Sequence, residues 1–138
     1  MSGDRTAPRP RILIVEDIFL IAQALETILV RHGYAVVGPY SRACQAMRAM
    51  REEVLDAAIL DISIQGDNVL IVAEALLRHG IPIIFASAGD SDTLPPAFRG
   101  APYLRKPYST EELVETVAEA LQSRRAAGPS IDTPSGDR

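Results

Sequence analysis

The sequence predicts an α/β fold in which a doubly wound, five-stranded parallel sheet carries helices on both faces. Continuous apolar runs recur at 12–15, 57–60 and 83–86, and such runs are typical of strands buried on both faces. Amphipathic segments with helical spacing separate these runs. Two of those segments end in the tripeptide Arg-His-Gly, at 31–33 and 78–80, and another apolar run follows each at once.

The first half of the chain is predicted to contain three strands and two helices. The strands are expected at 12–15, 34–37 and 56–61, although the pattern at 57–60 also fits a short buried helical segment. The first helix presents Ile21, Leu25 and Ile28 on one face and ends at Gly33 after basic residues. The second helix begins near Ser41, after Gly38-Pro39 closes the second strand, and its apolar face is expected to hold Ala43, Met47 and Met50.

The second half continues the alternation. A helix capped by Asp67 or Asn68 precedes a strand at 83–86, and the adjacent prolines at 95 and 96 predict that the fourth helix is short or irregular. A fifth strand is expected at 101–104. The last helix opens on a capping box, Ser109-Thr110-Glu111-Glu112.

Length and composition favour one domain, at 11–122. Residues 1–10 are interpreted as a disordered lead-in and residues 123–138 as a flexible tail. The net charge of −4, with no basic block beyond Arg124-Arg125, argues against nucleic-acid binding. No apolar run reaches the roughly 18 residues of a membrane span, and the single cysteine, Cys44, fits a reducing compartment. We therefore expect a cytoplasmic protein that binds neither nucleic acid nor membrane.

Five polar side chains fall at the ends of predicted strands, and so at one edge of the sheet. They are Glu16, Asp17, Asp61, Ser87 and Lys106. In a sheet of order 2-1-3-4-5 the first and third strands are neighbours at the switch point where ligands bind. Three carboxylates would then converge, and their repulsion favours a hard divalent cation, most naturally Mg²⁺. Lys106 and Ser87 suit a phosphoryl group carried by Asp61.

Four motifs together resemble the receiver domain of two-component response regulators. They are Ile12-Leu13-Ile14-Val15-Glu16-Asp17, Leu60-Asp61, Ala86-Ser87-Ala88 and Lys106-Pro107-Tyr108. The resemblance implies a flavodoxin-like fold in which Asp61 is the phosphoacceptor. It further implies that Glu16, Asp17, Asp61 and the backbone carbonyl of Ser63 hold Mg²⁺. It makes Ser87 and Tyr103 the switch residues and Lys106 the phosphate-pairing cation, with a cis Lys106–Pro107 bond.

The resemblance also implies a role in phosphorelay signalling. A histidine kinase or histidine phosphotransfer protein would phosphorylate Asp61, and the signal would leave through protein contacts, with a homodimer as a further option. Enzymatic activity beyond self-phosphorylation and self-dephosphorylation is not expected. Two surfaces are candidates for partner contacts: the stretch 88–108, and the helix beginning near Ile18, where Phe19, Leu20 and Val30 extend the apolar face.

The stretch Phe85-Ala86-Ser87-Ala88-Gly89 is similar to the Phe-Ala-Thr-Gly motif of a subgroup of stand-alone alphaproteobacterial receivers, with Ala88 in place of the glycine. Members of that subgroup have a poorly formed fourth helix. Two other functions stay open: a degenerate receiver that binds partners without phosphorylation, and a phosphate sink that drains a kinase.

Overall fold

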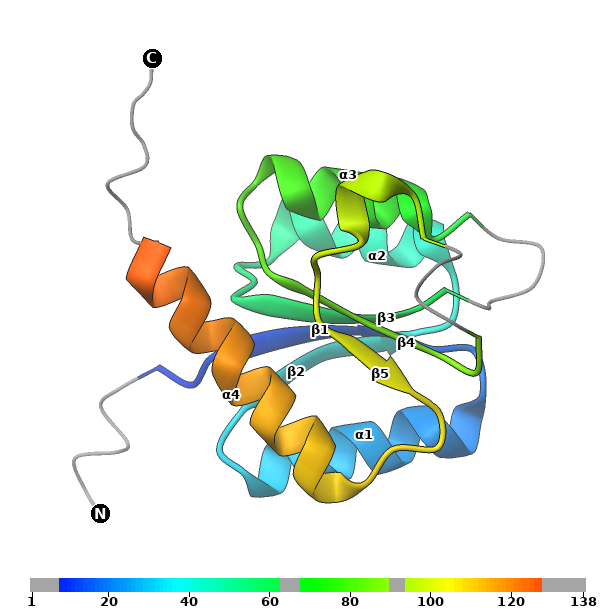
Figure 1. Cartoon of the computed structure of the whole chain (residues 1–138). Helices are drawn as coiled ribbons and strands as arrows, with labels where there is room; N and C mark the ends of the chain where they lie inside the picture. The colour runs from blue at the N-terminus through cyan, green and yellow to red at the C-terminus, as the bar shows by residue number, and fades with distance from the viewer. Residues whose placement is uncertain (1–7, 63–67, 90–93, 128–138) are drawn as a thin grey trace.

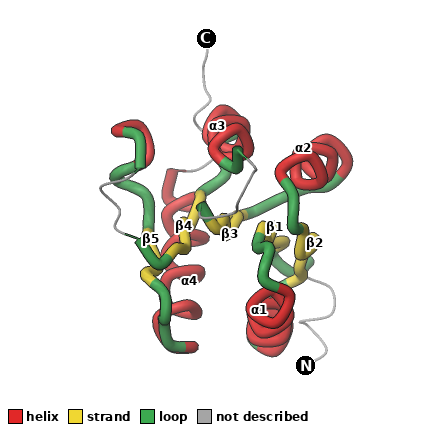
Figure 2. The backbone as a smooth tube through the Cα atoms, turned by 90° about the vertical axis from the view of Figure 1, so that its right-hand side faces the viewer, coloured by secondary structure: helices red, strands yellow, loops and turns green. Residues whose placement is uncertain are grey.

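A parallel five-stranded sheet in the order β2-β1-β3-β4-β5 forms the centre of the protein, which confirms the predicted fold class. The computed structural model describes residues 8–62, 68–89 and 94–127. The strands are β1 (Arg11–Val15), β2 (Ala35–Tyr40), β3 (Ala57–Asp61), β4 (Ile83–Ser87) and β5 (Tyr103–Arg105). The α-helices within these ranges are α1 (Phe19–Arg31), α2 (Ala43–Glu52), α3 (Leu70–Arg78) and α4 (Thr110–Ala127). Helices α2 and α3 cover one face of the sheet, and α1 and α4 cover the other (Figures 1 and 2).

The continuous apolar runs are explained by burial of both faces of the sheet. Every residue of β3 and β4 is buried. Within β3, Ala58 and Leu60 pack towards α2 and α3, whereas Ala57 and Ile59 pack towards α1 and α4. Side chains on a strand alternate between faces, so two buried faces require apolar residues at successive positions. The alternative of a helical segment at 57–60 is wrong.

The second strand is longer than predicted. It was expected to end before Gly38-Pro39, but β2 continues through this dipeptide to Tyr40. A proline is compatible with β2 because this strand lies at the edge of the sheet. The fifth strand starts later than expected, at Tyr103, because Pro102 has no backbone N–H and contributes only its carbonyl, which accepts from Phe85 N at 3.0 Å. In α2 the buried face is formed by Ala43, Ala46 and Ala49, whereas the two methionines expected there are half-buried beside them.

The described part of the connection between β4 and β5 has little helical structure, as predicted. Its described residues form a single 3-10 turn, Pro96–Phe98. Phe98 is buried and packs edge-to-face against Phe85 of β4, with ring centroids 5.5 Å apart. Arg99 Nε donates to the carbonyl of Leu94 at 3.0 Å, and Leu94 is also buried. The residues between Leu94 and β5 are therefore held by the core, although no α-helix forms among them.

The last helix begins at the predicted capping box and ends later than expected. Ser109 Oγ accepts from Glu112 N at 3.0 Å, and Glu112 Oε1 accepts from Ser109 N at 2.9 Å. Helix α4 then continues to Ala127, past residue 123 where the tail was expected to start. Arg124 Nη1 donates to Leu55 O at 2.7 Å, so a contact distant in sequence anchors the final turns. Within the described residues, none of the helices combines the length and apolarity needed to cross a bilayer.

Candidate functional site

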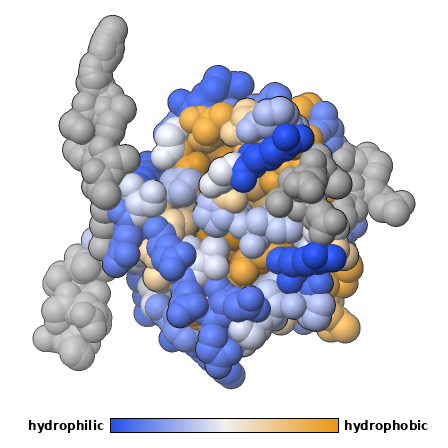
Figure 3. All heavy atoms as spheres, viewed as in Figure 1, coloured by the Kyte–Doolittle hydropathy of each residue, from blue (hydrophilic) through white to orange (hydrophobic). Residues whose placement is uncertain are grey.

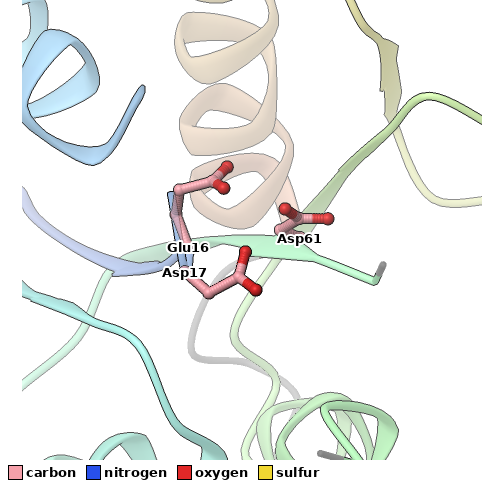
Figure 4. Close-up of side chains that lie close together, drawn as sticks. All are labelled: Glu16, Asp17 and Asp61. Atoms are coloured by element: carbon pink, nitrogen blue, oxygen red, sulfur yellow. The ribbon is translucent and has the colours of Figure 1, made fainter. Parts of the chain in front are cut away.

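Three carboxylates converge where β1 and β3 end side by side. Asp61 is the last residue of β3, and Glu16 and Asp17 follow β1, whose Val15 pairs with Leu60. One carboxylate oxygen from each residue lies within 4.8 Å of the other two, and Figure 4 shows the three side chains around one small space. Glu16 and Asp61 are buried, with 3% and 1% of their surface exposed, whereas Asp17 is exposed.

Lys106 lies between the two buried carboxylates. Its Nζ donates to Asp61 Oδ2 at 2.9 Å and to Glu16 Oε1 at 3.0 Å. The lysine follows β5, and its backbone N–H donates to Ser87 O at 2.9 Å, which holds the strand end against β4. The Lys106–Pro107 bond is cis, as is the Gly38–Pro39 bond. Lys106 thus contacts two of the three carboxylates, which outnumber the single ammonium group.

Two side chains of this site, Glu16 and Lys106, have shifted pKa values. Burial and the adjacent Asp61 carboxyl raise the pKa of Glu16 above its usual value, against the opposing effects of Lys106 and the Ile18 amide. Burial lowers the pKa of Lys106, but its hydrogen bonds and charge interactions with Asp61 and Glu16 outweigh burial, and the net pKa is raised. A raised pKa is expected for a buried carboxyl group such as Glu16, and for an ammonium group beside two carboxylates such as Lys106.

The donor set fits a hard divalent cation. Carboxylate oxygens are the ligands that Mg²⁺ prefers, and an exposed edge of the site suits an ion that keeps several water ligands. Glu16, Asp17 and Asp61 would hold it. When bound, Mg²⁺ would neutralise charge on a phosphoryl group beside Asp61. Ser63, whose carbonyl was implied as a further ligand, lies outside the described residues.

The two proposed switch residues meet at Gly89. Ser87 ends β4, is 4% exposed, and its Oγ accepts a hydrogen bond from Gly89 N at 3.2 Å. Tyr103 begins β5, and its hydroxyl donates to the carbonyl of Gly89 at 2.6 Å. Ala86 of β4 pairs with Asp61 of β3, and Ser87 is the next residue of β4, so Ser87 lies beside the acidic cluster. Sequence reasoning did not identify Gly89 as their shared partner.

An apolar groove of about 620 Å³ borders the site. Its lining includes Leu20, Ala24 and Ile28 from α1, and Lys106 and Tyr108 from the loop after β5. At the N-terminal end of α1, Phe19 and Leu20 are 69% and 74% exposed, and hydrophobic atoms gather there at the lower right of Figure 3. The sequence had indicated such a surface, because this helix has apolar residues beyond those expected on its buried face. The contribution of Tyr108, a half-buried residue whose pKa is raised by burial, was missed.

Several of the similar solved structures are described as receiver domains or response regulators. A receiver domain protein from Methanospirillum hungatei JF-1 is 26% identical, with a TM-score of 0.77 over 87% of this chain and 99% of that one. SdrG from Sphingomonas melonis Fr1 is 35% identical, with a TM-score of 0.72 over 83% and 98% of the two chains. The response regulator TrrA from Thermotoga maritima, solved in complex with Mg²⁺-BeF, is 27% identical, with a TM-score of 0.72 over 81% and 99%.

A family model agrees with the structural similarity. The model of the response regulator receiver domain matches residues 12–118, which include Glu16, Asp17, Asp61, Ser87 and Lys106. The matched range begins at the second residue of β1, includes the other four strands in full and ends within α4. The chain belongs to the response regulator receiver domain family.

Proposed function

We propose that this protein acts as a response regulator whose Asp61 accepts a phosphoryl group from a histidine kinase or a histidine phosphotransfer protein. One observation carries the proposal: Lys106 Nζ bridges Asp61 and Glu16 within a cluster of three carboxylates. A phosphorylation-independent binding module would not need this buried and unbalanced set of charges. The Mg²⁺-BeF complex of TrrA, a protein of the same fold and family, supports the same chemistry for Asp61 and Mg²⁺.

In the proposed transfer, a carboxylate oxygen of Asp61 attacks the phosphorus of a phosphohistidine. The P–O bond forms as the P–N bond breaks, and the electron pair stays on the imidazole nitrogen, which takes up a proton. Lys106, already within hydrogen-bonding distance of Asp61, pairs with a phosphoryl oxygen, and the Ser87 hydroxyl donates to another. Attack of water on the phosphorus later breaks the P–O bond to Asp61, which releases inorganic phosphate and returns Asp61 to a free carboxylate.

The phosphodonor is proposed to dock on α1. The apolar groove between α1 and the loop after β5 leads directly to Lys106, so a helix seated there would bring its histidine close to Asp61. Its apolar lining suits the hydrophobic face of an amphipathic helix. The exposed side chains of Phe19 and Leu20 enlarge this surface at its outer end.

The output is proposed to leave through the stretch 88–108. Ser87 and Tyr103 both bond to Gly89, so a change at the phosphorylated site reaches this stretch by a short route. Among the described residues between β4 and β5 only a 3-10 turn forms, which supports membership of the Phe-Ala-Thr-Gly subgroup. We further propose a cytoplasmic location and no enzymatic activity apart from self-phosphorylation and self-dephosphorylation. A phosphate sink would use the same site without a downstream partner.

A labelling experiment tests the phosphoacceptor. The protein is incubated with Mg²⁺ and acetyl phosphate, and intact-mass and peptide analysis locate any added phosphoryl group. Asp61→Asn should abolish labelling. The matched control is Asp56→Asn at the opposite end of β3, where Asp56 Oδ2 accepts from Arg11 N at 2.8 Å, and it should be labelled normally. Labelling of the Asp61→Asn variant at the unmodified rate, or labelling in excess chelator, would overturn the proposal.

A further inference from the structure

Strand β2 contains one extra residue directly beside the acidic cluster. Leu13 of β1 pairs with Val37, but Val15 pairs with Tyr40, so β1 advances two residues while β2 advances three. Such a bulge changes which backbone groups of the bulged strand, here β2, face the neighbouring strand. Here it places the carbonyl of Tyr40 opposite Glu16, and Glu16 N donates to Tyr40 O at 2.8 Å.

The bulge requires glycine at position 38. Gly38 has φ of +101°, a conformation that residues with a side chain rarely adopt. A Cβ atom at this position would lie 2.8 Å from Tyr40 N and 3.0 Å from Ile14 O. Both of these atoms belong to backbone, so neither can turn aside as a flexible side chain would. A side chain at position 38 would therefore separate β1 from β2 at their ends.

Separation of β1 from β2 would affect the position of Glu16 in two ways. Tyr40, on one side of the added Cβ, accepts the backbone hydrogen bond of Glu16, and Ile14, on the other side, precedes Glu16 by two residues in β1. The Glu16 carboxylate is itself held by two contacts: Oε1 accepts from Lys106 Nζ at 3.0 Å, and Oε2 accepts from Ile18 N at 3.2 Å. Its position thus depends on the backbone that carries it.

We infer that Gly38 and the Tyr40 carbonyl are positioning elements for the metal-binding carboxylate of Glu16. The inference rests on the proposed Mg²⁺ site. Groups that orient a metal ligand without touching the metal typically change metal affinity by about 10- to 100-fold when they are altered. We expect Gly38→Ala to weaken Mg²⁺ binding by about tenfold, within that range.

The matched control is Gly33→Ala. Gly33 also has positive φ, at +91°, but it follows α1 and has no atom within 4 Å of an added Cβ. Both variants should lose stability from backbone strain, and only Gly38→Ala should lose Mg²⁺ affinity. Mg²⁺ dissociation constants are measured by amide chemical-shift titration of the folded protein. Labelling rates with acetyl phosphate across a Mg²⁺ series should show a higher half-saturating Mg²⁺ concentration for Gly38→Ala.

Hydrogen exchange provides a second readout that does not involve the metal. In Gly38→Ala the Glu16 amide should exchange faster, while Ile59 in the central strand stays protected. Unchanged Mg²⁺ affinity in a folded Gly38→Ala protein, or an equal loss in Gly33→Ala, would overturn the inference. If Gly38→Ala does not fold, the unmodified protein decides: Mg²⁺ should increase protection of the Glu16 amide, and an unchanged exchange rate would overturn the inference. Failure of the unmodified protein to bind Mg²⁺ would instead refute the proposed site.

Discussion

Replacing Lys106 with methionine should destabilise the protein in the absence of divalent cations. Methionine keeps most of the apolar stem and removes the ammonium group, so Glu16 and Asp61 stay next to each other and lose the charge of Lys106. Both acidic side chains are 1% exposed and that of Lys106 is 16% exposed, so water screens these charges poorly. Removing one partner of a buried ion pair costs about 3–5 kcal/mol. Because Lys106 is partly exposed, the expected loss is about 3 kcal/mol, at the lower end of this range.

The free energy of unfolding is measured by urea denaturation in excess chelator. A second measurement, with Mg²⁺ at about one hundred times its dissociation constant, should stabilise a protein that keeps the site by about 2.7 kcal/mol. The double variant Lys106→Met/Glu16→Gln measures the coupling energy between the two side chains, because it also removes the charge of one of the two carboxylates that Lys106 contacts. The double variant should be more stable than Lys106→Met alone.

The reasoning is refuted by either of two results. A loss below about 1 kcal/mol for Lys106→Met would place the ion pair in the range of exposed surface pairs. Additive effects of Lys106→Met and Glu16→Gln would show that the two charges do not interact, because groups in direct contact give a coupling energy and independent groups do not.

Three further predictions follow from other contacts. Phe98→Ala, which removes a buried ring packed on Phe85, should cost about 3–5 kcal/mol in urea denaturation, and a smaller loss would mean that the 94–101 segment is not anchored by this ring. Ser109→Ala should cost about 1 kcal/mol through loss of the α4 cap, as measured by the thermal midpoint; an unchanged midpoint would contradict the capping role. Tyr103→Phe removes the hydroxyl that donates to Gly89 O, so labelling of Asp61 should persist while beryllofluoride-induced shifts at the Gly89 amide shrink. Equal shifts in both proteins would argue against this route.

Much of the fold and of the site can be predicted from the sequence, because buried segments and helix caps have local residue patterns. A strand covered on both faces needs successive apolar residues, as Ala57–Leu60 shows, and the exposed strand ends can then carry charge. Parallel strands end at the same edge of the sheet, so Asp61 and the acidic pair after β1 were expected to meet. The capping box at Ser109 is likewise a local signal, because both of its hydrogen bonds join residues three apart.

Contacts between distant segments were decided only by the tertiary structure. The extent of β2 depends on register with β1, and Gly38-Pro39, which usually ends a strand, is accommodated there by a bulge at the sheet edge. The end of α4 depends on Arg124 bonding to Leu55, 69 residues away in sequence. The hydrogen bond from Glu16 N to Tyr40 O uses a backbone carbonyl, which every residue possesses. Side-chain patterns report burial and local capping, whereas backbone pairing between segments has no residue-specific signature and arises only when the chain folds.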